Sequence, residues 1–300
     1  MSRVGVLVAG DGESKCAKTF TAEHLATEAQ YQKDRLSREL GRIVGLAPAG
    51  SILSGQVLSL GNLMFTNIVT ISAGNFFRGA GLYAERLEWS GRPKRAFARA
   101  DTEPLRELMA EKDILEQLQT DSVGNKASAA SRLPGALALC ETAFCETIRE
   151  EYHRDGGGHL VITDARNPLN IFARRGLVGS EHDQIDPLSV IPYYIDTPAE
   201  VAAGWLTGDY DEQLANIRHR RHSDATRPEH PITVPTNLIG DFDAWWDQFV
   251  SPRHEGVLAA PYHLINGANT EPAHTQWLGG KIVILAQDLF LSLNQDQSPV

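Results

Sequence analysis

Short apolar runs alternate along the chain with stretches of helical pattern. The run at residues 4–9, VGVLVA, is rich in valine and contains no charged residue, which favours a strand covered on both faces of a parallel sheet. Similar runs predict further strands at 67–72, 159–163, 191–196 and 234–239. Because these runs and the helical segments alternate, the pattern indicates an α/β protein.

Apolar positions spaced three and four residues apart predict helices between the strands. These helices are predicted at 17–38, 101–119, 135–153 and 211–221, with helix starts at 73–78 and 197–200. A further helix is predicted for the aromatic segment DFDAWWDQF at 241–249. The sequence beyond it contains no readable motif and is expected to form an extension that docks on the rest.

The composition is that of an ordinary soluble globular protein. The 300 residues are 42% hydrophobic and 22% charged, and no apolar run approaches the roughly 18 residues that a membrane span needs. The N-terminus lacks the layout of a signal peptide, so a cytoplasmic protein without a membrane partner is expected. The net charge of -10 argues against broad, sequence-independent nucleic-acid binding, although it leaves room for a local basic groove.

The residues directly after the first strand fit a nucleotide-binding loop. Residues 12–19, GESKCAKT, match the spacing G-x-x-x-x-G-K-[ST], except that Ala17 occupies the place of the second glycine. In such a loop, backbone N–H groups surround the phosphates, Lys18 would reach the β and γ phosphates, and Thr19 would bind Mg²⁺. The Ala17 methyl is expected to weaken nucleotide binding or to require a small backbone shift. The alternative is an ordinary strand-to-helix turn that contains a lysine.

Two polar segments supply further candidate residues. Residues 164–167, DARN, follow the third predicted strand, at the edge where ligands gather in parallel sheets. Residues 218–227 place several arginines around Asp224, near the end of a predicted helix. The alternatives are a helix cap or turn for Asp164 and a solvated helix face for the arginines. His219 and His222 lie among these arginines, where binding of a metal cation is unfavourable.

Taken in order, the motifs resemble those of the cytidylate kinase branch of the nucleoside monophosphate kinases. They are the 12–19 loop, ISAGNFFRG, VGNKASAASRLP, VITDARN, YYIDTPAE and RRHSDATR. The resemblance spans residues 4–239, with apparent insertions near 35–66, 169–188 and 204–214. It implies a P-loop kinase with a three-layer α/β/α fold and a parallel sheet. The kinase core would cover 1–240 with a lid around 209–228, and a C-terminal extension at 241–300 would dock on it.

The resemblance also implies a role for each matching residue. The donor ATP would be bound by Gly12, Ser14, Ala17, Lys18 and Thr19. Phosphoryl transfer would depend on Lys18, Asp164, Arg166, Arg220 and Arg227. The acceptor would be held by Arg78, Ser128, Arg166, Asn167 and Asp224. The cofactor Mg²⁺ would be held by Thr19 and Asp164.

Three departures from the family pattern concern the acceptor. Leu137 replaces an arginine near the cytosine, Asn167 replaces an aspartate, and Ala73 replaces a small hydroxyl residue. These departures indicate that the donor machinery is kept while the acceptor is not simply CMP. The expected acceptor is a pyrimidine nucleotide, either CMP-like, dCMP-like or modified.

Two alternatives to this reaction remain open. One is phosphorylation of a hydroxyl, such as that of 5-hydroxymethyl-deoxyuridine in phage DNA, with Asp164 or Asp11 as the base. The other is a nucleotide-binding regulator without catalysis. The sequence leaves the oligomeric state undetermined.

Overall fold

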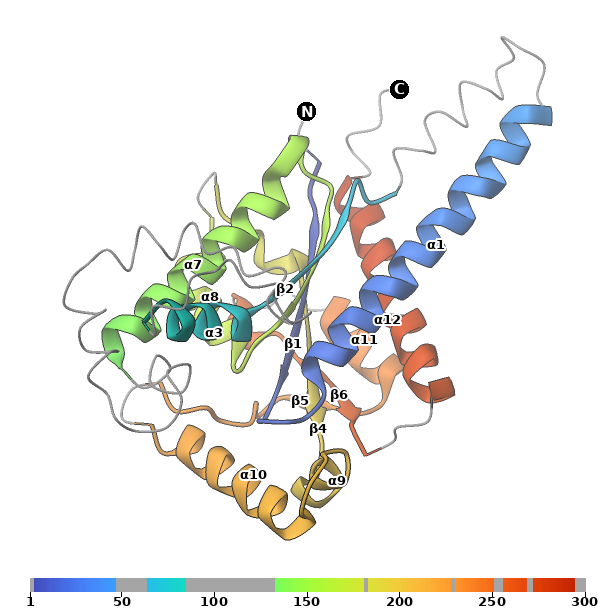
Figure 1. The fold of residues 1–300 in the computed structure, drawn as a ribbon. Coiled ribbons are helices and arrows are strands. Elements are labelled where there is room, and N and C mark those ends of the chain that lie inside the picture. Colours follow the sequence, from blue (N-terminus) through green and yellow to red (C-terminus); the bar gives the residue numbers. More distant parts are fainter. Residues whose placement is uncertain are drawn as a thin grey trace.

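A parallel six-stranded sheet forms the centre of the protein (Figure 1). The computed structural model describes residues 3–46, 64–84, 133–180, 183–227, 230–250, 256–268 and 272–294. The strands are β1 (Val6–Gly12), β2 (Ile68–Ser72), β3 (Leu160–Asp164), β4 (Val190–Asp196), β5 (Leu238–Ile239) and β6 (Tyr262–Asn266). Their order is β2-β3-β1-β4-β6-β5, and every neighbouring pair is parallel.

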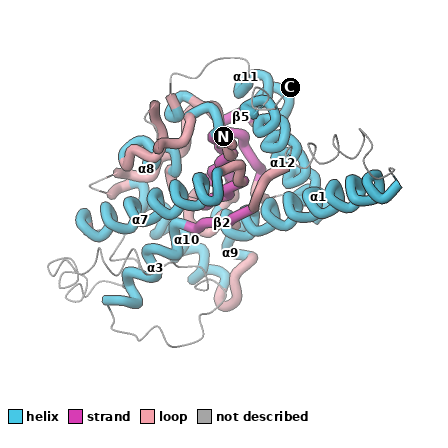
Figure 2. Tube along the Cα trace, turned by 90° about the horizontal axis from the view of Figure 1, so that it is seen from above, coloured by secondary structure: helices cyan, strands magenta, loops and turns pink. Residues whose placement is uncertain are grey.

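Helices cover both faces of this sheet, which Figure 2 shows as the inner layer. One face carries α3 (Ala73–Ala84), α7 (Pro134–His153) and α8 (Pro168–Arg174). The other carries α1 (Lys18–Leu46), α11 (Phe242–Val250) and α12 (Pro272–Asn294). The predicted three-layer α/β/α arrangement is therefore confirmed. Short 3-10 turns lie at η2 (Arg154–Gly156), η3 (Pro187–Ser189) and η4 (Val257–Ala259).

Two further helices lie beyond the carboxyl ends of the strands. These are α9 (Ala199–Gly204) and α10 (Tyr210–Ala225), at the bottom of Figure 1. The side chain of Asp209 caps α10 by accepting a hydrogen bond of 2.9 Å from the Glu212 N–H. This cap satisfies a backbone donor at the start of the helix.

The apolar pattern of β1 follows from its central position in the sheet. Leu7 and Ala9 contribute to the core under α3, α7 and α8, whereas Val6 and Val8 contribute to the core under α1, α11 and α12. Successive side chains of a strand point to opposite faces. A strand that is covered on both faces therefore needs the uninterrupted apolar run seen in the sequence.

The sheet differs from the prediction at its C-terminal side. The strand predicted at 234–239 is shortened to Leu238–Ile239 at the edge, and Pro235, which has no N–H to donate to a ladder, lies in the part that is not a strand. The strand β6 was not predicted, and it lies between β4 and β5. The expected boundary at 240 therefore falls inside the sheet, and residues beyond 241 belong to its core.

The last described helix closes over the first strand. Asn294 of α12 accepts a hydrogen bond of 2.9 Å from the Val4 N–H and donates one of 3.0 Å to the Val4 carbonyl oxygen. Phe290 packs its ring against that of Phe65, with ring centroids 4.8 Å apart. Within the part of the chain that the structure describes, no helix has both the length and the apolar character needed to span a membrane.

Candidate functional site

The loop between β1 and α1 has a backbone that favours glycine at several positions. Gly12 has φ 146°, and a Cβ atom there would lie 2.4 Å from Cys16 Sγ, so only glycine fits. Lys15 and Ala17 are in the left-handed region, at φ 64° and 65°. A left-handed backbone costs a non-glycine residue about 1 kcal/mol. Ala17 therefore departs from the sequence pattern at a position where the backbone itself favours glycine.

The Lys18 ammonium group is held against the loop. Its Nζ donates hydrogen bonds of 2.6 Å to the Gly12 carbonyl oxygen and 2.7 Å to that of Glu13. It also lies 3.5 Å from Cys16 Sγ. The ammonium group thus links the start of α1 to the first residues of the loop. Its hydrogen bonds go to carbonyl oxygens, which an anion can replace as acceptors.

The first turn of α1 is bonded to the end of β3. Thr19 Oγ1 donates a hydrogen bond of 2.6 Å to Asp164 Oδ2, and Asp164 is buried as the last residue of its strand. Hydroxyl and carboxylate oxygens are the ligands that Mg²⁺ prefers. No group of three or more His, Cys, Asp or Glu side chains suited to a metal occurs among the described residues. A magnesium ion held by Thr19 and Asp164 would therefore take its remaining ligands from phosphate groups and water.

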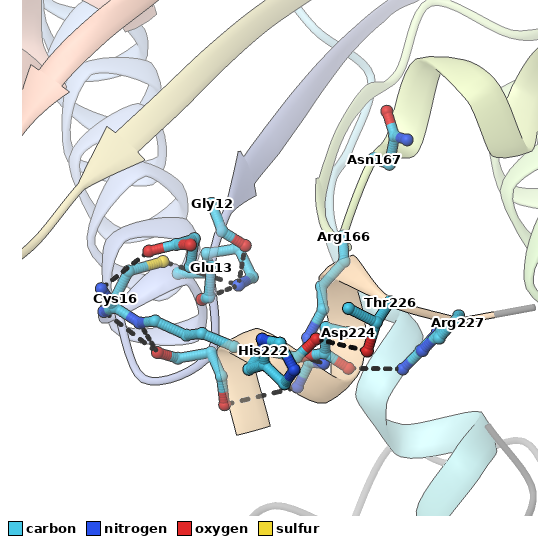
Figure 3. A network of polar contacts seen from close by, with 12 residues as sticks. Gly12, Glu13, Cys16, Arg166, Asn167, His222, Asp224, Thr226 and Arg227 are labelled. Atoms are coloured by element: carbon cyan, nitrogen blue, oxygen red, sulfur yellow. Dashed lines mark hydrogen bonds and ion pairs between the residues drawn. The ribbon is translucent and has the colours of Figure 1, made fainter. Parts of the chain in front are cut away.

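One carboxylate holds two of the predicted arginines. Asp224, buried near the end of α10, forms an ion pair with Arg166, which follows β3, and one of 2.7 Å with Arg227. Burial lowers the pKa of Arg227, and the charge of Asp224 opposes that shift. Arg166 Nη2 also donates a hydrogen bond of 3.5 Å to Ser14 Oγ. Figure 3 shows this network joining the end of β3, the end of α10 and the loop.

An arginine that the sequence analysis did not assign binds α10 to the loop. Arg221 donates hydrogen bonds to the carbonyl oxygens of Ser14, at 3.3 Å, and Thr197, at 2.8 Å. It also forms an ion pair of 2.7 Å with Glu13. The signal for it was helical spacing, because Arg221 lies four residues after the buried Ile217 and therefore on the inner face of α10.

Two predicted cations lie beside this network. Arg78 of α3 contacts the Asn75 side chain, and burial lowers its pKa while the nearby charge of Asp164 opposes that shift. Arg220 is exposed on α10, directly before Arg221. The charges of both arginines act on Lys15, whose pKa is lowered by burial and by these two neighbours.

The predicted acceptor residues are only partly brought together. Asn167 uses its backbone N–H to bond Asp11, and its side chain accepts from Asn170, pointing away from the arginine network in Figure 3. Leu137 and Ala73, two of the departures from the family pattern, are buried core residues. Ser128 and the helix predicted at 101–119 lie outside the described residues.

Asp11 is a buried carboxyl group beneath this edge of the sheet. It is 1% exposed, and its Oδ1 accepts hydrogen bonds from the N–H groups of Gly12, at 2.6 Å, and Asn167, at 2.9 Å. Its Oδ2 has no partner among the described residues. Burial raises the pKa of Asp11 to about 6, against the lowering effect of these two bonds and of the charges of Lys18 and Arg166.

Comparisons with known proteins assign no family to this chain. No protein-family model matches the chain, and a search of curated proteins finds no match.

Proposed function

We propose that this chain is an ATP-dependent phosphotransferase that moves the γ-phosphate to a nucleotide-type acceptor, a pyrimidine nucleotide of the CMP or dCMP kind or a modified one. The observation that carries the proposal is the position of Lys18 and the bonded Thr19–Asp164 pair at the sheet edge where Arg166 and Arg227 converge. Phosphoryl transfer requires mainly positioning and positive charge, because its transition state spreads negative charge over the transferring group.

Each group would have a distinct task at this edge. The Lys18 ammonium group would exchange the carbonyl oxygens of Gly12 and Glu13 for phosphate oxygens. The planar guanidinium groups of Arg166 and Arg227 suit bidentate contacts with phosphate. Magnesium held by Thr19 and Asp164 would supply neutralising charge at the β and γ oxygens.

The contacts around the loop support the presence of oriented donors. Arg221 joins α10 to the Ser14 and Thr197 carbonyl oxygens, and Asp224 fixes the direction of Arg166 and Arg227. A phosphoryl group held between the loop and α10 would therefore meet oriented donors at once. Preorganised donors of this kind stabilise developing charge better than water does, because they need no reorganisation during the reaction.

A hydroxyl acceptor is the second candidate, and Asp11 favours it. A phosphate acceptor is already nucleophilic, whereas a hydroxyl needs a base within hydrogen-bond reach. Asp11 Oδ2 has no partner among the described residues, and a pKa of about 6 suits a base near neutral pH. Because Asp11 is 1% exposed, this role would require residues 164–167 to move away from the loop.

Transfer from γ-labelled ATP with Mg²⁺ tests both candidates. Acceptors to be offered are CMP, dCMP, dUMP, pyrimidine nucleosides and DNA containing 5-hydroxymethyl-deoxyuridine. We expect label on one acceptor class, and a loss of at least about 100-fold for Lys18→Ala. The matched control is Arg35→Ala, at an exposed position of α1, which should leave transfer unchanged.

The pattern of results separates the candidates. Label on a mononucleotide phosphate that survives in Asp11→Asn supports the phosphate acceptor. Label on a hydroxyl that is lost in Asp11→Asn supports the second candidate. Binding of ATP without transfer to any acceptor would instead favour a regulator, and unchanged transfer in Lys18→Ala would refute the assigned site.

A further inference from the structure

The helices α9 and α10 form a unit with a small core of its own. Ala202 and Ala203 of α9 pack against Ile217 of α10, and this cluster is separate from the two apolar clusters that flank the sheet. In Figure 1 the two helices lie together beyond the carboxyl ends of the strands. The apolar side chains of this α9–α10 unit therefore hold the two helices to each other, and polar side chains join the unit to the loop between β1 and α1.

Arg221 makes the direct contacts between α10 and this loop. Its Nη1 forms an ion pair of 2.7 Å with Glu13 Oε2. Its Nη2 donates hydrogen bonds of 3.3 Å to the Ser14 carbonyl oxygen and 2.8 Å to the Thr197 carbonyl oxygen. One guanidinium group thus joins α10, the loop and the segment that leads into α9. The Arg221 side chain is 13% exposed, so water and salt screen its charge less than they screen that of an exposed arginine.

A second ion pair of α10 has a different position. Arg218 pairs with Glu200 at 2.5 Å, but both side chains are more than half exposed, and the pair joins α10 to α9. Exposed pairs of this kind contribute little to stability. The position of the α9–α10 unit on the loop therefore depends on the Arg221–Glu13 pair, and the Arg218–Glu200 pair provides a matched comparison.

The contacts of Arg221 cover part of the loop that a phosphate would approach. Ser14, in the middle of the loop, is 3% exposed, and it is bonded both by Arg221 and by Arg166. The Glu13 carbonyl oxygen accepts a hydrogen bond from Lys18, whereas the Glu13 carboxylate holds Arg221. A ligand that contacts Ser14 must therefore displace α10, and one residue connects the hold on Lys18 with the hold on α10.

We propose that the ion pair between Arg221 and Glu13 is a latch that holds the α9–α10 unit closed over the loop, so that a nucleotide binds only after the latch opens. This inference rests on the proposed phosphotransferase function for the identity of the ligand, and it adds a control of access to the same site. The motif resemblance gives neither Arg221 nor Glu13 a role. Because only molecules with an open latch bind, the open fraction scales the apparent rate and affinity of nucleotide binding.

Distances between two spin labels test the latch in the protein without nucleotide. The labels are attached through Ala215→Cys on α10 and Arg35→Cys on α1, both at exposed positions, and the three native cysteines are buried. Glu13→Gln keeps the size of the side chain and removes its charge, so we expect it to shift and broaden the distance distribution. The matched control Glu200→Gln, which removes the exposed pair, should leave the distribution unchanged.

Association rates of a fluorescent ATP analogue with Mg²⁺ test the consequence for binding. Both Glu13→Gln and Arg221→Gln should bind the analogue about tenfold faster than the unmodified protein, the factor expected when one charge-assisted hydrogen bond no longer favours the closed form. The two substitutions change the local charge in opposite directions. An effect of charge alone on the anionic nucleotide would therefore raise one rate and lower the other.

Three results would overturn the latch. They are an unchanged distance distribution in Glu13→Gln, an equal change in Glu200→Gln, and rate changes of opposite sign in Glu13→Gln and Arg221→Gln. Failure of the unmodified protein to bind the ATP analogue would refute the phosphotransferase proposal. The distances, which are measured without nucleotide, would still decide whether α10 is latched, so the two failures are distinguishable.

Discussion

The Thr19 hydroxyl and the Asp164 carboxylate, 145 residues apart in sequence, are joined by a hydrogen bond of 2.6 Å. The bond ties the start of α1 to the end of β3 and places two oxygen ligands side by side. Geometry of this kind is suited to a hard cation. The proposed magnesium site can therefore be tested by substitutions at these two residues.

Asp164→Asn should weaken the use of Mg²⁺ because it removes the charged ligand while keeping the shape of the side chain. We expect transfer to fall by at least about 100-fold and half-saturation to move to higher Mg²⁺ concentration. Initial rates measured across a Mg²⁺ series check this. Thr19→Ser, which keeps the hydroxyl, serves as the control and should retain most activity. A Mg²⁺ dependence identical to that of the unmodified protein would remove Asp164 from the metal site.

Asp224→Asn should destabilise the fold, because it leaves Arg166 and Arg227 close together without their shared carboxylate. The Arg166 side chain is 33% exposed, so solvent screening reduces the effect to about 2 kcal/mol of unfolding free energy. Urea denaturation measures it, and added sulfate should recover part of the loss. The control is Glu200→Gln, which breaks the exposed pair with Arg218 and should change stability by less than about 0.5 kcal/mol. Equal effects of both substitutions would contradict the role given to Asp224.

Ala17→Gly should raise stability by less than about 1 kcal/mol, because it removes the strain of a left-handed alanine, which is about 1 kcal/mol. The greater freedom of glycine in the unfolded chain offsets part of that gain. The affinity for ATP should also rise, since the loop would reach its phosphate-binding conformation more easily. Thermal unfolding and calorimetry measure the two effects. Ala26→Gly, inside α1, provides the opposite case and should lower stability by about 1 kcal/mol.

Asp11 should make stability depend on pH. Its pKa in the folded protein is raised to about 6 from 3.8, so the folded chain binds the proton more tightly than the unfolded chain does. Its contribution to stability therefore decreases as the pH rises from 3.8 to about 6 and stays low above that. Asp11→Asn should raise the unfolding free energy at pH 7.5 by up to about 3 kcal/mol.

The gain from Asp11→Asn should shrink as the pH falls toward 4, where the native carboxyl group is also neutral. Denaturant unfolding at a series of pH values measures this difference. A gain that stays constant with pH would show that the substitution acts through packing, not through the charge of the carboxylate.

Local patterns predicted most of the fold. Val6–Gly12 was predictable as a buried strand because its composition matches coverage on both faces. The strand β6 was not, since Tyr262–Asn266 is short and lies between Pro261 and Gly267, which read as loop residues. Its place between β4 and β5 depends on pairing with strands distant in sequence, and no local pattern encodes that pairing.

The candidate site was predictable to the extent that its residues follow a spaced motif. Lys18 and Thr19 occupy specified positions of the loop pattern, and Asp164 follows an evident strand. Arg221 was missed because its contacts lie on elements distant in sequence. It reaches back to the carbonyl oxygens of Ser14 and Thr197.

The hydrogen bonds between Val4 and Asn294 join two segments that are synthesised far apart in time. The first strand leaves the ribosome long before α12, whose buried residues complete the core on one face of the sheet. Nascent chains that expose an uncovered sheet face and an unpaired edge are prone to aggregate. Because β6 must also enter beside β4, this face is covered only by α1 at first, and its core stays incomplete until translation has nearly reached residue 294. We therefore expect a dependence on chaperones during synthesis that the finished, closed fold no longer has.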